Sequence, residues 1–140
     1  MKNVVLDTNC LLMSLSRRGN YYKIWRELIE GKYVLCYTNE ILAEYEEILT
    51  QKMGSLIAGN VISAILNLPN TLQAQVYFHL HLITIDPDDD KFVDCAFKCN
   101  AHFIVTQDHH YDVLHDVEFP VIDVISIDEF LEILNNSAEC

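Results

Sequence analysis

Short apolar runs alternate with longer segments of helical periodicity along this chain of 140 residues, and this alternation restricts its fold more than any other feature. The runs are rich in β-branched and aromatic residues and are bounded by polar or turn residues, which is typical of buried strands. They predict five strands, at residues 3–6, 33–37, 82–85, 103–106 and 121–124. The spacing between them predicts helices at residues 22–30, 39–52, 56–68, 89–99 and 127–134, and the segment 56–79 accommodates one helix or two.

Strands that alternate with helices are joined by right-handed crossovers and form a mostly parallel sheet that is covered on both faces. The predicted fold is therefore a three-layer α/β/α sandwich with a sheet of about five strands. With only 4 Gly and 3 Pro, and no repeat or linker, residues 1–140 are expected to form a single domain. Ser126 and Glu129 have the spacing of a capping box that begins the last helix.

The chain is strongly acidic, with 21 Asp and Glu against 9 Lys and Arg and a formal net charge of -12. Such a surface repels phosphate backbones and anionic membranes. The last basic residue is Lys98, so a polyanion is expected to approach the N-terminal half. No apolar run reaches the roughly 20 residues needed to span a bilayer, and the first residues do not resemble a signal peptide, so a cytoplasmic location is expected. The five cysteines are odd in number and lack a C-x-x-C pair, which indicates reduced thiols.

Acidic residues follow three of the predicted strands at the point where each strand ends. Asp7 follows residues 3–6, Asp108 comes two residues after Thr106, and the acidic cluster 86–90 follows residues 82–85. The carboxyl ends of parallel strands meet at one edge of a sheet, where ligand sites form. A single Asp there is explained equally well by a helix cap or a turn, but several carboxylates at one edge repel each other unless a cation neutralises them.

The residue types at this edge favour a hard divalent cation. Ligands that are all oxygen favour Mg²⁺ or Mn²⁺ over zinc. An EF-hand loop that starts at Asp86 is excluded, because Lys91 stands at its glycine position and Phe97 at its final glutamate position. The helical pair Cys95 and Cys99 lacks a second ligand pair that would complete a zinc site, so it is expected to be buried and structural.

Four segments, VVLDTN, ILAEYEEIL, DPDDDKFVDCA and FIVTQD, resemble the PIN-domain family in order and spacing. The likeness is greatest to the VapC-like subgroup, the toxin components of toxin-antitoxin modules, and it extends over residues 4–134. The resemblance implies a ribonuclease whose acidic centre binds Mg²⁺ or Mn²⁺. The family's acids fall on Asp7, Glu44, Asp90 and Asp108, with Asn9, Asp94 and Thr106 as accessory residues.

For two of these positions, the residues alone leave more than one candidate acid. Glu44 and Glu46 flank the apolar stripe of their helix about equally, and the family pattern is what selects Glu44. Asp86, Asp88 or Asp89 replaces Asp90 if the helix begins at another residue. The chain also has Gln107 where the family's common T-G-D phrase has glycine.

A group of basic residues follows the first strand and offers RNA a route to the acidic edge. Tyr21, Tyr22 and Trp25 lie in the same stretch and are suited to stack on unpaired bases, although the core or a dimer contact explains Tyr22 and Trp25 equally well. The predicted nucleic-acid contacts are Arg17, Arg18, Lys23 and Arg26.

The expected activity is hydrolysis of RNA phosphodiester bonds by a water molecule that Mg²⁺ or Mn²⁺ activates. The resemblance also implies an antitoxin as protein partner and a homodimer. The alternative is a catalytically idle PIN-like module that binds a protein partner or nucleic acid. A receiver-like signalling domain is disfavoured, because it needs a lysine after a late strand and none follows Lys98.

Overall fold

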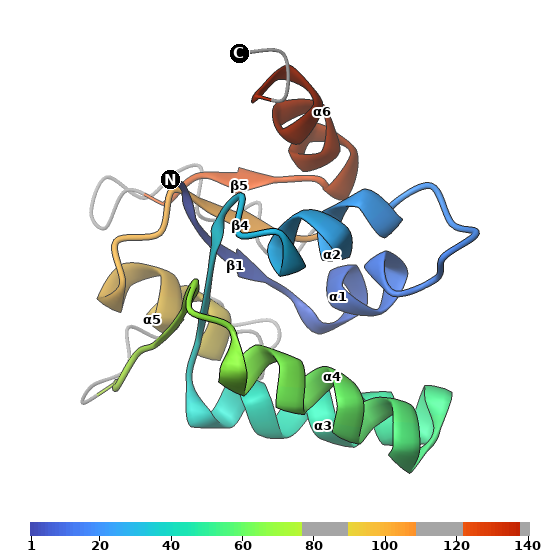
Figure 1. Ribbon diagram of the computed structural model, residues 1–140. Coiled ribbons are helices and arrows are strands. Elements are labelled where there is room, and N and C mark those ends of the chain that lie inside the picture. Colours follow the sequence, from blue (N-terminus) through green and yellow to red (C-terminus); the bar gives the residue numbers. More distant parts are fainter. Residues whose placement is uncertain (77–89, 109–121, 138–140) are drawn as a thin grey trace.

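The computed structural model describes residues 1–76, 90–108 and 122–137 and contains one parallel sheet with helices on both faces (Figure 1). Each strand is short, and strands alternate with helices over most of the described chain, as the sequence pattern predicts. In chain order the elements are β1 (Asn3–Leu6), α1 (Thr8–Ser14), α2 (Tyr22–Ile29), β2 (Val34–Tyr37), α3 (Asn39–Met53), α4 (Ser55–Asn67), β3 (Thr71–Gln73), α5 (Asp90–Lys98), β4 (Phe103–Val105), β5 (Val124–Ile125) and α6 (Ile127–Ser137).

The strand order is β3-β2-β1-β4-β5, and every neighbouring pair is parallel. The order reverses direction between β3 and β4, so right-handed crossovers place α5 on the opposite face from α1 to α4. Figure 1 shows α5 on one side of the central strands and α1 and α2 on the other. The predicted α/β/α sandwich is confirmed, and its central strand β1 carries the first candidate acid at its carboxyl end.

The core is built from the continuous apolar runs of the inner strands. Val4, Val5 and Leu35 are fully buried, because these strands have helices on both faces. Tyr33 and Phe130 add an edge-to-face ring contact with centroids 5.1 Å apart, which joins the residue before β2 to α6. The sheet is therefore a rigid base for the loops at its carboxyl edge.

Three helices begin at side chains that cap them. Asp7 accepts a hydrogen bond from Cys10 N at 2.8 Å and caps α1, and Thr38 accepts one from Ile41 N at 3.2 Å and caps α3. The predicted capping box is confirmed, because Ser126 and Glu129 each accept a bond at 3.1 Å from the other's backbone N–H. Two of these caps sit directly after β1 and β2, so the same residues end a strand and begin a helix at the candidate site.

Several predicted boundaries need correction. Helix α1 was not predicted, because its uncharged sequence TNCLLMS carries no amphipathic pattern and only the cap at Asp7 marks its start. The strand β3 at Thr71–Gln73 was also missed, since three residues are too few for an alternating pattern. The last strand comprises Val124–Ile125 rather than residues 121–124. The predicted strand at 82–85 lies outside the described residues.

Helix α4 ends at Asn67, and β3 follows, so the described part of 56–79 holds one helix and a strand. The four cysteines among the described residues are buried and unpaired, as expected. In the part of the chain that the structure describes, none of the helices has both the length and the apolar character that crossing a bilayer requires.

Candidate active site

Asp7 is the centre of the candidate site. It follows β1 directly, its backbone N–H donates to Val105 O at 3.1 Å, and its side chain is 7% exposed. Burial raises the pKa of this carboxyl, and the nearby charge of Asp108 raises it further, while hydrogen bonds from Thr106 and Cys10 act in the opposite direction. Two carboxylates are thus brought close enough to repel each other, as the strand ends predict.

Thr106 connects these two acids. Its hydroxyl donates a hydrogen bond to Asp7 Oδ2 and accepts one from the backbone N–H of Asp108 at 3.0 Å. The threonine is buried and follows β4 directly, so its position is fixed by the pairing of β4 with β1. Thr106 thus bridges the two acids, and the accessory role that the family pattern gives it stays a prediction.

Gln107 fixes the loop that carries Asp108. Its side-chain oxygen accepts a hydrogen bond from Ile127 N at 2.9 Å, at the start of α6. The residue that replaces the family's glycine thus joins the end of β4 to the last helix, and Asp108 itself is half-buried.

Glu44 reaches the same edge from the middle of α3. Its Oε2 accepts a hydrogen bond from the hydroxyl of Thr8, and its Oε1 lies 2.8 Å from Lys91 Nζ. Glu46, the other acid that periodicity allowed, is exposed to solvent. Of the two, Glu44 is therefore the acid that faces the end of β1, as the family pattern selects.

The next residue, Tyr45, anchors this part of α3 to the sheet. Its side chain is fully buried, and its hydroxyl donates to Leu6 O, the last residue of β1. Burial raises the pKa of Tyr45 well above its usual value, so the phenol stays a neutral donor.

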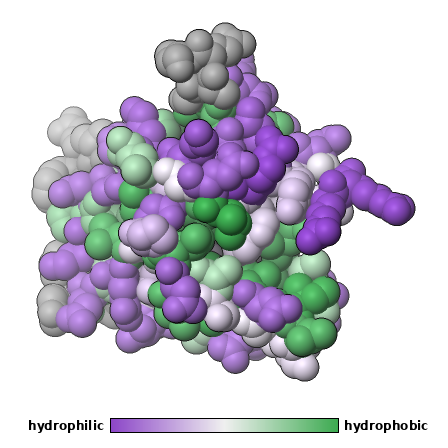
Figure 2. Space-filling model, in the orientation of Figure 1, coloured by the Kyte–Doolittle hydropathy of each residue, from purple (hydrophilic) through white to green (hydrophobic). Residues whose placement is uncertain are grey.

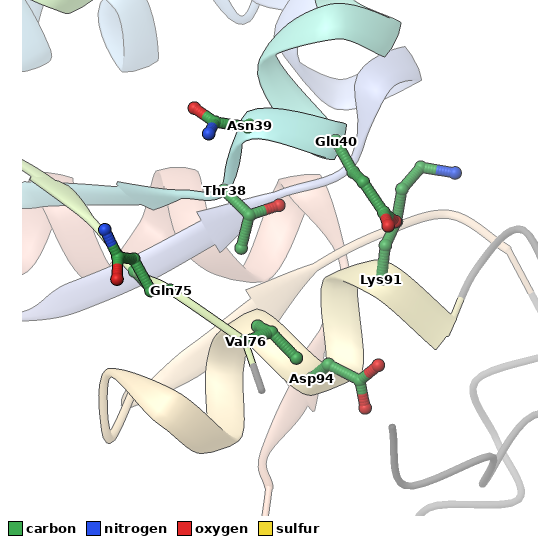
Figure 3. Close-up of a pocket in the computed structure, with 8 residues that line it drawn as sticks. Thr38, Asn39, Glu40, Gln75, Val76, Lys91 and Asp94 are labelled. Atoms are coloured by element: carbon green, nitrogen blue, oxygen red, sulfur yellow. The ribbon is translucent and has the colours of Figure 1, made fainter. Parts of the chain in front are cut away.

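Asp90 and Asp94 belong to the first and second turns of α5. Asp90 begins the helix, Asp94 lies four residues later on the same face, and both side chains are buried. Asp94 lines a pocket of about 270 Å³ together with Thr38 and Lys91 (Figure 3). The alternatives Asp86, Asp88 and Asp89 lie outside the described residues.

The pocket lies between the start of α3, the segment after β3, and α5 (Figure 3). Its lining includes the apolar residues Ala74 and Val76 and the polar residues Asn39, Glu40 and Gln75. Asn39 is held in place, because its side-chain oxygen accepts a bond from Gln73 Nε2 at 2.6 Å. The pocket therefore adjoins the Glu44 and Lys91 pair at the carboxyl ends of β2 and β3.

The described carboxylates are gathered along one edge but do not form a complete ligand cage. Within residues 1–76, 90–108 and 122–137, no group of three or more His, Cys, Asp or Glu side chains is arranged to hold a metal ion. The donors are all oxygen, and the mutual repulsion of Asp7 and Asp108 would be relieved by a cation. The chemistry of the site thus fits a hard divalent ion, with Asn9 exposed one residue beyond Thr8.

The four basic residues predicted to bind RNA separate into two places. Arg17 and Arg18 are exposed in the segment between α1 and α2, where Figure 2 shows hydrophilic side chains that project from the surface. Lys23 and Arg26 belong to α2 and line a second pocket, of about 500 Å³, with Lys2 and other residues. Lys2 precedes β1, so this second pocket lies toward the amino ends of the strands, opposite to the acids.

Lys23 and Arg26 are also engaged with acids of their own helix. Lys23 Nζ lies 3.7 Å from Glu27 Oε1 and donates to Asn135 Oδ1 at 2.6 Å, and Arg26 Nε lies 3.8 Å from Glu30 Oε1. Arg17 and Arg18 are therefore the better placed of the four to meet a polyanion at the acidic edge.

Sequence reasoning overlooked two contributors to the site. No sequence motif marks Thr8 as a site residue, and its hydrogen bond to Glu44 joins residues 36 positions apart. Lys91 entered the sequence analysis only at the glycine position of the excluded EF-hand loop, and nothing in the sequence pairs it with Glu44, which lies 47 positions earlier.

Comparison with solved structures shows that other proteins share this fold. The chain superposes on VapBC2 from Rickettsia felis, determined with a promoter DNA fragment, with a TM-score of 0.61 at 14% identity, covering 89% of this chain and 98% of that one. VapBC from Salmonella typhimurium bound to DNA superposes with a TM-score of 0.61 at 15% identity, covering 91% of this chain and 99% of that one. VapC20 of Mycobacterium tuberculosis, a toxin that cleaves the sarcin-ricin loop, superposes with a TM-score of 0.55 at 14% identity, covering 78% of this chain and 92% of that one.

Sequence comparison gives the family directly. No curated protein sequence matches the chain significantly. The sequence profile described as "PIN domain" matches residues 3–110, which include Asp7, Glu44, Asp90 and Asp108. Since this match extends over more than half of the chain, the protein belongs to the PIN-domain family.

Proposed function

We propose that this protein is a metal-dependent endoribonuclease and the toxin of a toxin-antitoxin module. The observation that carries the proposal is the network around Asp7, in which Thr106 links Asp7 to Asp108 and Thr8, the residue after Asp7, donates a hydrogen bond to Glu44. Family membership supports nuclease chemistry. The structural neighbours, which include an RNA-cleaving toxin and VapBC complexes, support the toxin role.

Cleavage of a phosphodiester requires that its negative charge be neutralised and that a nucleophile be available at neutral pH. A bound Mg²⁺ or Mn²⁺ ion supplies both, through Lewis acidity and a water molecule of lowered pKa. In this proposal Asp7, Glu44, Asp90 and Asp108 hold the ion, and Asp94 supports Asp90 from the next turn of α5. Thr8 and Thr106 orient two of the carboxylates by hydrogen bonds to Glu44 and Asp7.

The partners follow from the same proposal. An antitoxin would cover the acidic edge, and a basic inhibitory segment suits a chain of net charge -12. We propose a homodimer and a cytoplasmic location in line with the toxin role. RNA enters past Arg17 and Arg18, which are exposed beside α1.

A catalytically idle module that binds a protein or nucleic acid is the second candidate. It is favoured by the pairing of Glu44 with Lys91 and by the lack of a three-ligand cluster among the described residues. In that case the acids would serve only the fold and the binding surface.

Expression in a bacterial host, combined with an assay of the purified protein on RNA, separates the two candidates. The nuclease arrests growth and cleaves RNA in Mg²⁺ to products that carry a 5′-phosphate, and Asp7→Asn and Glu44→Gln remove both effects. Glu46→Gln, which alters the same charge on an exposed position of the same helix, leaves them intact. A wild-type protein that neither cleaves RNA nor arrests growth, in Mg²⁺ or Mn²⁺, supports the binding module instead.

A further inference from the structure

We propose that Lys91 is an exchangeable counterion of Glu44, which gives up this carboxylate to the metal ion and then binds a phosphate group of the RNA. The inference rests on the proposed function, since it concerns which cation neutralises Glu44 in the same site. It predicts that metal binding strengthens the binding of an RNA phosphate, because the metal ion takes Glu44 and so frees Lys91 to contact the phosphate.

The ion pair between Lys91 and Glu44 is short and mostly shielded from water. Lys91 Nζ lies 2.8 Å from Glu44 Oε1, and the two side chains are 13% and 28% exposed. The ammonium also lies 5.4 Å from the ring centroid of Phe92. A charge pair at this distance and exposure is screened less than a surface pair, so it holds Glu44 against competing cations.

Both oxygens of Glu44 are in use, one by Thr8 and the other by Lys91. A cation that coordinates Glu44 must therefore displace at least one of them. Thr8 is buried at the start of α1 and has little freedom to move. Lys91 carries a point charge on a flexible four-carbon stem, so it is the partner that leaves.

The pocket of about 270 Å³ gives the released ammonium a second place to act. Lys91 lines this pocket, but Figure 3 shows its nitrogen turned away from Val76 and Asp94. Thr38, Asn39 and Gln75 supply hydroxyl and amide groups nearby. The acids Glu40 and Asp94 also line the pocket, so a phosphate is accepted there only after a metal ion has offset part of their charge.

Lys91→Met tests the proposal by two binding measurements, neither of which depends on activity. Titration of Mn²⁺ into the metal-free full-length protein, followed by electron paramagnetic resonance, should show binding about tenfold tighter in the variant, because the competitor for Glu44 is gone. Uridine 5′-monophosphate, which has a phosphate but no phosphodiester bond, should bind about tenfold more weakly to the variant in saturating Mn²⁺. In EDTA its affinity should be weak and equal in both proteins.

Two further variants serve as controls. Lys98→Met removes the same charge from the other end of α5 and should change neither affinity. Lys91→Arg keeps the charge and should retain the nucleotide affinity in Mn²⁺, and thermal unfolding confirms that each variant is folded.

Mn²⁺ affinity that is unchanged or weaker in Lys91→Met overturns the proposal. So does a loss of nucleotide affinity that is the same in Mn²⁺ and in EDTA, because Lys91 would then be a simple phosphate contact. If the wild type itself fails to bind Mn²⁺, the proposed function falls, and this result is distinct from the other two.

Discussion

The hydroxyl of Thr8 donates a hydrogen bond to Glu44 Oε2 and thereby joins the first residue of α1 to the middle of α3. These two residues are 36 positions apart, and the bond is the direct link between the end of the central strand and the helical acid. The position of Glu44 in the site thus depends on a side chain that follows Asp7 in the chain. This arrangement makes Thr8 a positioning residue.

Thr8→Val should lower the rate of RNA cleavage about tenfold or more while it leaves the fold intact. A hydrogen bond to a charged group contributes about 1.5–3 kcal/mol, and valine keeps the shape of threonine without the hydroxyl. Single-turnover cleavage and thermal unfolding measure the two effects. Thr8→Ser, which restores the donor, should recover most of the rate, and equal defects in both variants would show that the hydroxyl has no positioning role.

Thr106→Val should move the acid limb of the pH–rate profile to higher pH. The hydroxyl of Thr106 stabilises the ionised form of Asp7 and so lowers its pKa, against the opposite effect of burial. Without this donor the pKa of Asp7 rises further, and the metal-binding carboxylate is lost at a higher pH than in the wild type. The profile of cleavage against pH between about 4 and 8 measures the shift, with Thr106→Ser as the control that keeps the hydroxyl. An acid limb that does not move would exclude Thr106 from tuning Asp7.

Asp7→Asn should stabilise the metal-free protein at neutral pH, by about 1 kcal/mol, although it abolishes activity. The pKa of Asp7 is raised in the folded protein, so folding favours its protonated form, and this contribution to stability is lost as the pH rises from the unfolded-state pKa through the folded pKa. The gain from asparagine should therefore be fully present at pH 7, shrink as the pH falls through the folded pKa of Asp7, and disappear below about 4, where Asp7 is protonated in both states. Urea unfolding of both proteins in EDTA at pH 4 and pH 7 measures this difference. A variant that is less stable than the wild type at pH 7 would contradict the raised pKa assigned to Asp7.

The double substitution Arg17→Ala and Arg18→Ala should weaken RNA binding and reduce its salt dependence. Two fewer phosphate contacts reduce the slope of log affinity against log salt by about 1.4 for a single strand. Fluorescence anisotropy with a labelled single-stranded RNA, in an Asp7→Asn background that does not cleave, measures the slope. Lys23→Ala and Arg26→Ala together remove the same charge from the pocket toward the opposite edge and should have the smaller effect. Equal losses in the two double variants would show that RNA extends over both surfaces.

The order of strands and helices could be predicted because each inner strand is a continuous apolar run and most helices are amphipathic. The exceptions have physical reasons. Helix α1 is short and uncharged, and β3 is only three residues long, so neither shows a periodicity. The edge strand β5 is two residues long, and its pairing with β4 sets its bounds more than its own sequence does.

The sequence predicts the location of a candidate acid where the end of a strand determines it, and not where it depends on how a helix packs. Asp7 directly follows β1 and Asp108 lies three residues after the end of β4, and the sheet brings them together. Which face of α3 meets the sheet depends on tertiary packing, so the choice of Glu44 over Glu46 needed the family pattern. The contacts that Glu44 makes with Thr8 and Lys91 join elements far apart in the chain, and no local pattern encodes them.

The most direct test of the account is RNA cleavage by the purified protein as the metal is removed and returned. In EDTA the wild type should lose its activity, and addition of Mg²⁺ or Mn²⁺ in excess of the chelator should restore it. Asp7→Asn should remain inactive, or at least about 100-fold slower, under every condition. Cleavage that persists in EDTA, or that is equal in the wild type and in Asp7→Asn, would contradict a metal-dependent centre built on Asp7.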